Sequence, residues 1–450
     1  MFQKMLKSYY ALLFALLSVS GHAFATNPNT VIGIVTDENP ATIDSPYFLA
    51  ISPDGQKIYV SNLGNGTVSV VDVATNTVTG LVNDSLSAFH DNYGVVFTPN
   101  GQTAYVMNSL SPYSISIINT ATNTVTGTIN TTAAALDGAF NMEITPNGNY
   151  GYVAGGTYIT VVDLLTNATT QNIILPITNS EVNSIAITPD GTKAYAILDS
   201  GNLYAIDLTN NTVIGAVTGT FANSFGSAIT PNGSTLYIAN STLNSVSIVD
   251  VATNAQTGTV TDLNPATFNY PFALAITPDG STLYVVNDAG ESVSIVDTAT
   301  NTVTGIITDL NPPTFHGPLD MIVTPNGAYG YVLNANSGTV SIVYISTPIL
   351  PPTNASGCQS SDTFLLQQDL VNILTWSAPT SGTAPVSYKI YRDAGLTNLV
   401  ATVPAAGALK YIDHNRGAGV SYTYYIVSVD AQADVSTAVE VVVNSACPSA

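Results

Sequence analysis

Residues 276–297 read ITPDGSTLYVVNDAGESVSIVD, and this stretch decides the fold because its pattern recurs along the chain. A four-residue phrase occurs seven times between Pro53 and Pro325, at intervals of 42 to 47 residues. Its first residue is Thr or Ser, its second is Pro, its third is Asp or Asn, and its fourth is Gly. Each copy carries a tyrosine six residues after its proline, as Tyr284 follows Pro278. A period of this length indicates one supersecondary unit that is repeated many times.

Each repeat predicts four short strands rich in β-branched residues and bounded by Gly, Pro, Asn and Asp. In the quoted copy we expect strands over residues 272–276, 282–286, 292–297 and 302–307. Many of these strands are apolar on both faces, which predicts sheets that are covered on both sides. Four-stranded units repeated in one chain are typical of a β-propeller.

Two phrases carry a resemblance to a known family. Tyr284-Val285-Val286-Asn287 and Tyr59-Val60-Ser61-Asn62, with the Pro-Asp-Gly turns beside them, resemble the YVTN family of propeller repeats. The resemblance covers residue 29 to about residue 347. It implies an all-β fold with a seven-bladed β-propeller, of the kind found in secreted and surface-layer proteins.

The two ends of the repeat predict how the ring closes. Residues 29–37 match the fourth strand of a repeat, as seen at residues 301–309, whereas the last copy stops near Tyr344 without a fourth strand. We therefore expect the N-terminal strand to complete the last blade and to leave no open sheet edge. Deletion of residues 26–38 is then expected to unfold or aggregate the ring.

The N-terminus predicts export. Residues 1–25 have the form of a signal peptide, with Lys4 and Lys7 before an apolar run and an Ala23-Phe24-Ala25 cleavage site. No other apolar run is long enough to span a bilayer, so we expect no integral membrane segment. The mature propeller, residues 26–347, is expected in the periplasm, at the cell surface or outside the cell.

A second domain is predicted after a Pro-rich linker at residues 348–356. Residues 357–450 resemble a fibronectin type III domain in the phrases around Trp376, Tyr388 and Tyr422, which implies a small β-sandwich with Trp376 in its core and Tyr422 as its corner tyrosine. The chain has two cysteines, Cys358 and Cys447. In an exported protein a disulfide between them is the natural interpretation, with two unpaired thiols as the alternative.

The charge is strongly one-sided. The chain holds 29 acidic and 8 basic residues, for a formal net charge of −21, and the predicted ring keeps only Lys57 and Lys193 against 22 acidic residues. Nucleic-acid binding requires clustered Lys and Arg, so this partner class is excluded. The negative potential of the ring is expected to repel anions and to attract cations.

Candidate site residues lie nine positions before each repeat proline, in the loops that enter each blade. These positions hold Asp44, His90, Asp137, Ser180, Ala222, Asn269 and His316. One interpretation is that they satisfy loop backbone groups. The other is a ligand site formed by Asp44, His90, Asp137, Asn269 and His316, in which Asp44, His90 and His316 are candidate ligands of a divalent cation. No other cofactor is predicted.

Two further sets of polar residues stand out. Nine positions after each proline the residue is usually Asn, as at Asn62 and Asn287, and we interpret these as structural caps on the same face as the candidate loops. Glu143 and Asp320 occur in first strands where other copies are mostly small or apolar. We expect them to line a solvated channel; ion pairing and a general acid–base role are the alternatives.

The sequence favours an exported, non-enzymatic binding or cell-surface protein that presents its propeller to a protein or glycan. The alternative is a metal-dependent propeller hydrolase or lyase of the lactonase kind, with a His and Asp site at the funnel mouth. No P-loop, G-x-S-x-G, H-E-x-x-H or C-x-x-C motif is present. The sequence does not indicate the oligomeric state.

Overall fold

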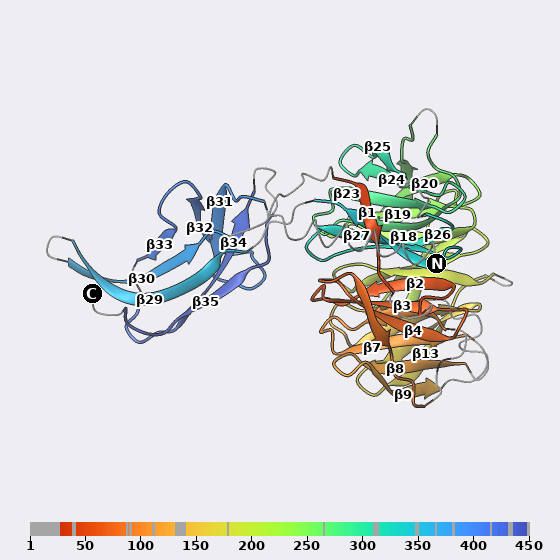
Figure 1. The fold of residues 1–450 in the computed structure, drawn as a ribbon, viewed down its shortest axis with the longest axis horizontal. Coiled ribbons are helices and arrows are strands. Elements are labelled where there is room, and N and C mark those ends of the chain that lie inside the picture. Colours follow the sequence, from red (N-terminus) through yellow and green to blue (C-terminus); the bar gives the residue numbers. More distant parts are fainter. Residues whose placement is uncertain are drawn as a thin grey trace, which may run out of the picture.

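The computed structural model describes residues 28–37, 42–86, 89, 92–109, 113–130, 141–177, 180–263, 266–308, 315–346, 351–364, 367–379, 383–414, 416–430 and 435–447. Every regular element in these ranges is a β-strand (Figure 1). The predicted signal peptide and the start of the predicted linker lie outside them. In the described part of the chain, no helix has the length and apolar character needed to cross a lipid bilayer.

Seven four-stranded antiparallel sheets form a β-propeller in the described ranges. The first strand of each sheet contacts the first strand of both neighbouring sheets, so these A strands form a closed cycle around an axis. The A strands are β2 (Pro46–Ile51), β6 (Asn92–Phe97), β10 (Asn141–Ile144), β14 (Val182–Ile187), β18 (Ser224–Ile229), β22 (Pro271–Ile276) and β26 (Pro318–Val323).

The remaining strands follow outward in chain order. The B strands are β3 (Lys57–Asn62), β7 (Thr103–Asn108), β11 (Tyr150–Gly155), β15 (Lys193–Leu198), β19 (Thr235–Asn240), β23 (Thr282–Asn287) and β27 (Tyr329–Asn334). The C strands are β4 (Thr67–Asp72), β8 (Ser114–Asn119), β12 (Tyr158–Asp163), β16 (Leu203–Asp207), β20 (Ser245–Asp250), β24 (Ser292–Asp297) and β28 (Thr339–Tyr344). The D strands are β5 (Thr77–Leu81), β9 (Thr124–Asn130), β13 (Ala168–Ile174), β17 (Thr212–Ala216), β21 (Ala255–Thr259), β25 (Thr302–Ile307) and β1 (Thr30–Ile34).

The N-terminal strand closes the ring, as the match at residues 29–37 predicted. β1 pairs antiparallel with β28, where Thr30 lies opposite Tyr344 and Ile34 opposite Ser341. In Figure 1 the red β1 lies beside strands from the far end of the propeller sequence. The last blade is therefore built from both ends of the propeller segment, and its outer strand is held to β28 by hydrogen bonds rather than by a connecting turn.

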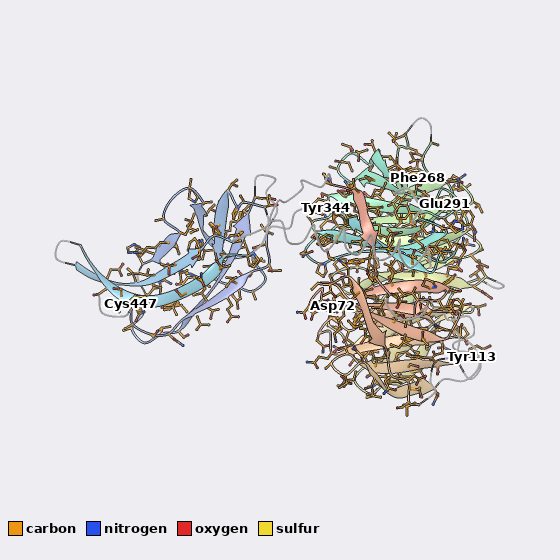
Figure 2. All side chains as sticks on the ribbon, in the orientation of Figure 1. Asp72, Tyr113, Phe268, Glu291, Tyr344 and Cys447 are labelled. Atoms are coloured by element: carbon orange, nitrogen blue, oxygen red, sulfur yellow. A yellow bond between two sulfur atoms is a disulfide. The ribbon has the colours of Figure 1, made fainter. Side chains whose placement is uncertain are left out.

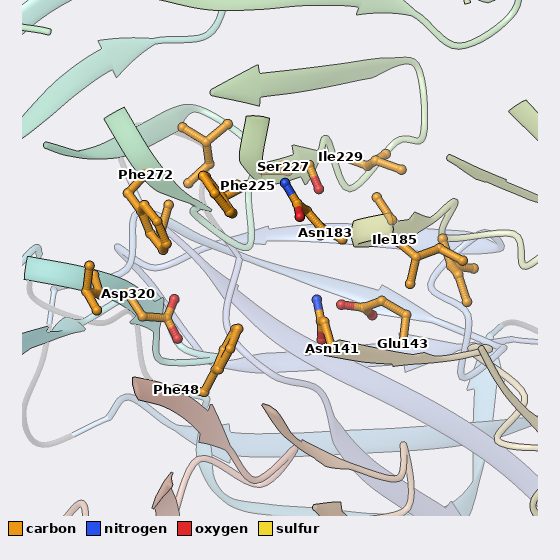
Figure 3. Close-up of a pocket in the computed structure, with 18 of the residues that line it drawn as sticks. Phe48, Asn141, Glu143, Asn183, Ile185, Phe225, Ser227, Ile229, Phe272 and Asp320 are labelled. Carbon is orange, nitrogen blue, oxygen red and sulfur yellow. The ribbon is translucent and has the colours of Figure 1, made fainter. Parts of the chain in front are cut away.

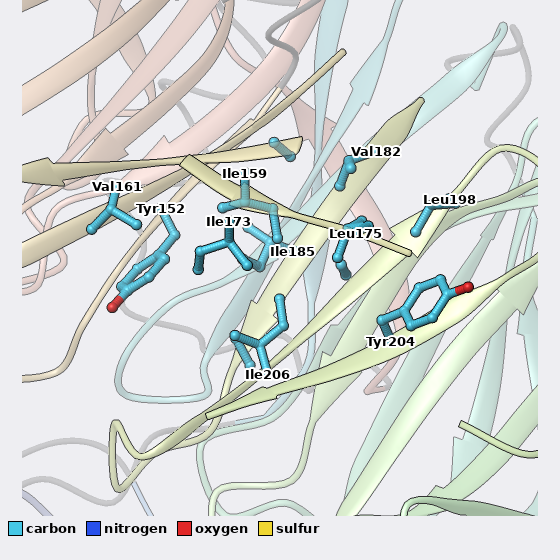
Figure 4. Close-up of a cluster of buried hydrophobic side chains, with 13 residues drawn as sticks. Tyr152, Ile159, Val161, Ile173, Leu175, Val182, Ile185, Leu198, Tyr204 and Ile206 are labelled. Atoms are coloured by element: carbon cyan, nitrogen blue, oxygen red, sulfur yellow. The ribbon is translucent and has the colours of Figure 1, made fainter. Parts of the chain in front are cut away.

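Hydrophobic clusters lie between adjacent blades. Between the third and fourth blades, Tyr152, Ile159 and Ile173 pack with Ile185 and Ile206, and all five are almost fully buried (Figure 4). The B strands are buried on both faces because each sheet is covered by a neighbour on either side. This explains why a charge-poor, Val- and Ile-rich sequence is compatible with the fold.

The tyrosine of each repeat links its blade to the next. Its hydroxyl donates a hydrogen bond to Oδ1 of an asparagine in the turn before the neighbouring D strand, and all seven asparagines have positive φ, which Asn tolerates well. The pairs are Tyr59–Asn123, Tyr105–Asn167, Tyr152–Asn211, Tyr195–Asn254, Tyr237–Asn301, Tyr284–Asn29 and Tyr331–Asn76, at 2.6 to 2.9 Å. These bonds form a closed ring of blade-to-blade contacts.

The turn between the A and B strands adds a second ring of contacts. At Gly280 φ is +75°, and an added Cβ would lie 2.9 Å from Cδ of Pro231 in the preceding blade. Glycine is therefore needed there both for its backbone conformation and for the close approach of the two turns. The Pro and Gly of the repeated phrase thus act between blades as well as within one.

The C-terminal residues form two sheets around one core. One sheet has the order β29 (Thr353–Phe364), β30 (Gln367–Ser377) and β33 (Lys410–Asp413). The other has the order β32 (Leu399–Pro404), β31 (Ser387–Tyr391), β34 (Tyr422–Val429) and β35 (Val439–Val443). Leu374 and Trp376 of the first sheet pack with Tyr388 and Tyr424 of the second. β29 begins four residues before the predicted boundary at residue 357, because Thr353 already pairs with Ser377.

The predicted disulfide is confirmed. Cys358 in β29 is bonded to Cys447, which follows β35, so the bridge joins the first strand of this domain to the segment after its last strand. Figure 2 shows Cys447 in the C-terminal part of the molecule, away from the propeller. Tyr422 accepts a hydrogen bond from the backbone N–H of Gly417 at 2.9 Å, the contact that a corner tyrosine makes.

Candidate ligand-binding cavity on the propeller axis

In the first and sixth blades, the described residues that enter the A strand lie beside the end of the B strand, on one face of the ring. The backbone N–H of Asp44 donates to Oδ1 of Asn62 at 3.2 Å, and the N–H of Asn269 donates to Oδ1 of Asn287 at 3.3 Å. Asn62 is fully buried, and its Nδ2 donates to Oγ of Ser69 at 2.9 Å. The asparagines nine residues after the repeat prolines are therefore structural caps, as the sequence indicated.

The structure gives His316 a partner other than Asp44. Nδ1 of His316 lies 2.8 Å from Oε1 of Glu291, and both side chains are at least half exposed. Asp44 is half-buried and accepts a 3.4 Å hydrogen bond from Oγ of Ser45. The described residues contain no group of three or more His, Cys, Asp or Glu placed to hold a metal ion.

Two of the predicted site residues lie outside the described ranges. They are His90 and Asp137, and the predicted metal site includes His90. Asn269 is exposed, with its backbone engaged as described above. The metal site remains a prediction.

A cavity of about 510 Å³ lies inside the ring of A strands (Figure 3). Residues of six A strands line it, from β2 through β10, β14, β18, β22 and β26. Along the fourth blade it extends from Glu181 at the entry loop to Pro189 at the A–B turn. The volume is within the range of about 300–1,000 Å³ that is typical of small-molecule sites.

Asp320 of β26 projects into this cavity and is held by two backbone donors. Its Oδ2 accepts from the N–H of Leu49 on β2 at 3.0 Å, and its Oδ1 accepts from the N–H of Met321 at 2.8 Å. Burial nevertheless raises the pKa of Asp320 to about 6, because desolvation of the charged form outweighs these two hydrogen bonds. The carboxylate is thus fixed in place across the junction that closes the ring.

Glu143 of β10 projects into the same cavity (Figure 3). No residue in the described ranges forms a hydrogen bond or ion pair with its carboxyl group. Burial raises the pKa of Glu143 to about 7, so it is partly protonated at neutral pH. Glu143 and Asp320 keep some accessible surface because they border the cavity, but the dense protein around them raises their pKa values.

Aromatic side chains form much of the apolar wall. Phe225 of β18 and Phe272 of β22 stack with ring centroids 4.8 Å apart. The ring centroid of Tyr47 in β2 lies 5.3 Å from that of Phe48 and 5.0 Å from that of Tyr93, with which Tyr47 makes an edge contact. Figure 3 shows Phe48 and Phe272 on either side of Asp320. The cavity therefore combines flat apolar surfaces with two carboxyl groups.

The sequence pointed to part of this site. Glu143 and Asp320 line the channel as expected, but they are more desolvated than the solvated lining we predicted. The aromatic wall was missed, although the signal is present: the position six before the repeat proline is aromatic in several copies, among them Tyr47, Phe225 and Phe272. The predicted site was in the loops, whereas the described cavity lies between the A strands.

Comparison with known families gives a partial match. The family model described as "Lactonase, 7-bladed beta-propeller" matches residues 203–318, about a quarter of the chain. These residues run from β16 to the first residue of β26 and include the A strands β18 and β22. No curated protein matches this chain.

Two solved structures share the fold. Hydrazine synthase from Kuenenia stuttgartiensis is 22% identical, with a TM-score of 0.57 over 72% of this chain and 99% of that one. The Cps50 (Swd1) β-propeller domain from Myceliophteria thermophila is 12% identical, with a TM-score of 0.56 over 67% of this chain and 98% of that one. At these identities the likeness concerns the fold alone, and with the family match it identifies the chain as a β-propeller protein.

Proposed function

We propose that this protein is an exported, non-enzymatic binding or cell-surface protein whose propeller holds its ligand in the axial cavity. The observation that carries the proposal is the cavity itself, which is preformed, about 510 Å³ in volume and lined by aromatic side chains with a few polar groups. This combination is typical of ligand sites. The ring of tyrosine–asparagine bonds supports it further, because a rigid scaffold lowers the entropy lost on binding.

The second domain fits the same role. Its two sheets have three and four strands in the order that a fibronectin type III domain has, and the positions of Trp376 and Tyr422 agree with that resemblance. We therefore propose a fibronectin type III-like domain as a spacer or adhesive module. The disulfide supports export, because such bonds persist mainly in oxidising compartments.

The binding function can be tested with the mature protein. We expect a glycan array and a soluble-ligand thermal-shift screen to yield at least one ligand class that stabilises the wild type. A Phe225→Ala variant, which removes one wall of the cavity, should lose that stabilisation while it keeps the same circular dichroism spectrum. Ligand binding that is unchanged in this variant would place the site elsewhere and contradict the proposal.

A second candidate function is lactone hydrolysis. It is favoured by the partial match to the lactonase model and by Glu143, because a carboxyl group with a pKa of about 7 suits general acid–base catalysis at neutral pH. The test is an assay for hydrolysis of a panel of γ- and δ-lactones, in which the acid released by ring opening is measured. Turnover that disappears in Glu143→Gln would establish this function and refute the non-enzymatic one.

A further inference from the structure

The charged side chains that line the axial cavity are all acidic. Glu143, Glu181 and Asp320 line it, and Tyr47 is the remaining titratable group among the described lining residues. Asp320 is hydrogen-bonded to two backbone N–H groups and Glu181 is exposed, so among these described residues Glu143 is the carboxyl without the hydrogen bond or counter-charge that carboxylates removed from water generally have.

The basic residues of the ring are engaged elsewhere. Nζ of Lys57 donates to the carbonyl oxygen of Thr120 at 2.8 Å, and Nζ of Lys193 donates to the carbonyl oxygen of Val251 at 2.6 Å. Residues 26–347 contain no arginine. Among the described residues no basic side chain lines the cavity, so a bound cation is a natural source of positive charge for its carboxylates.

The wall beside the carboxylates suits an organic cation. The hydrogen bond from Leu49 fixes Asp320 next to Phe48, and Phe272 lies on its other side (Figure 3). Aromatic faces attract ammonium groups, most strongly where the groups are desolvated. Phe225, stacked on Phe272, extends the flat surface and offers contact to an apolar body. A small hydrated metal ion would leave this apolar surface without a partner.

We propose that the axial cavity binds an organic cation, an ammonium group carried on an apolar body, with Asp320 and Glu143 as its counter-charges and the Phe225–Phe272 stack as its apolar contact. This inference deepens the proposed binding function and rests on it. It names the ligand class that the wall selects: the carboxylates disfavour anions, and the aromatic surfaces favour organic cations over inorganic ones.

The experiment compares 2-phenylethylammonium with its neutral analogue 2-phenylethanol by isothermal titration calorimetry at pH 8. We expect saturable binding of the ammonium and at least about tenfold weaker binding of the alcohol, since a charge-assisted hydrogen bond is worth about one to two factors of ten. Asp320→Asn and Glu143→Gln should each weaken the ammonium about tenfold, and Phe272→Leu should weaken it severalfold. Lowering the pH to 5 should also weaken binding, because Glu143 and Asp320 then become protonated.

The matched control is Asp72→Asn, which removes one charge from the far end of a C strand. Asp72 accepts hydrogen bonds from Thr75 in an exposed turn, and Asn119 performs the same role in the second blade, so this change should leave folding and binding intact. A uniform loss of affinity in Asp72→Asn and Asp320→Asn would show a nonspecific effect of net charge and overturn the proposal.

Two further outcomes separate this inference from the proposed function. No saturable binding of 2-phenylethylammonium or benzyltrimethylammonium up to about 10 mM overturns the organic-cation inference. If a neutral glycan still binds and Phe225→Ala abolishes that binding, the binding function stands without it. Lactone turnover that depends on Glu143 would instead overturn the proposed function.

Discussion

The hydrogen bond between Tyr284 and Asn29 gives a sharp test of how the ring is held closed. Tyr284 belongs to the sixth blade, whereas Asn29 precedes the N-terminal strand that completes the seventh. Tyr284 is 1% exposed, so Tyr284→Phe keeps the packed ring and removes only the donor. Oδ1 of the half-buried Asn29 then lacks this partner, and we expect a loss of about 1–2 kcal/mol in the free energy of unfolding.

The chain supplies its own control. Tyr152 makes the equivalent bond to Asn211 between the third and fourth blades, which the chain joins directly. We expect Tyr152→Phe to cost a similar free energy, because the local contact is the same. The two variants should differ in where the protein opens first: only Tyr284→Phe loosens a strand that is joined to its blade by hydrogen bonds alone.

Amide hydrogen exchange followed by mass spectrometry measures this difference peptide by peptide. The peptide that contains residues 28–37 should exchange about five- to thirtyfold faster in Tyr284→Phe, the factor that corresponds to 1–2 kcal/mol, and should be little changed in Tyr152→Phe. Tryptophan fluorescence is not a substitute, since Trp376 lies in the C-terminal domain. Equal exchange of this peptide in both variants would refute the view that closure is the weak point of the ring.

Three further predictions follow from the same structure. Glu143→Gln should stabilise the protein at pH 8 by up to roughly 3 kcal/mol and have little effect near pH 4. The reason is that the pKa of Glu143 is about 7 in the folded protein and lower in the unfolded chain, so the protein loses folding free energy as the pH rises from the unfolded pKa through 7. Chemical denaturation at both pH values measures this. Cys358→Ser should lower the stability of the C-terminal domain by about 4–5 kcal/mol in the chain-entropy model, read from Trp376 fluorescence, while propeller exchange stays unchanged. Deletion of residues 26–38 should expose the edge of β28 and cause aggregation, and a truncated protein that stays monomeric with the same melting temperature would contradict this.

Much of the fold could be predicted from the sequence because the repeat is regular. The strands of the repeat at residues 272–307 were placed to within one residue at each end, and the closing strand was recognised by its match to residues 301–309. The partners of the repeated tyrosines could not be predicted. Tyr284 bonds an asparagine 255 residues away in the chain, so the pairing depends on the assembled ring rather than on local sequence.

The site was harder to predict because its members are exceptions to the repeat. His and Asp are common metal ligands, but the backbone N–H groups of Asp44 and Asn269 donate to buried asparagines, which gives these loop positions a structural role. The aromatic positions of the A strands were not singled out as a site. Which apolar residues face a cavity and which face a neighbouring sheet depends on strand twist and blade number, and the sequence pattern does not encode these directly.

The contrast between repeated and unrepeated positions points to where function resides. Three residues before the repeat proline, the third repeat has Glu143. Four of the other six repeats have alanine at this position: Ala50, Ala186, Ala228 and Ala275. Alanine at that position would remove a carboxyl whose ionisation opposes folding at neutral pH. Glu143 therefore makes the propeller less stable at neutral pH than the alanine of the other repeats would. Buried ionisable groups with strongly shifted pKa values cluster at functional sites. A ligand that supplies the missing positive charge would reverse this loss when it binds, which links the cost of Glu143 to the role of the cavity.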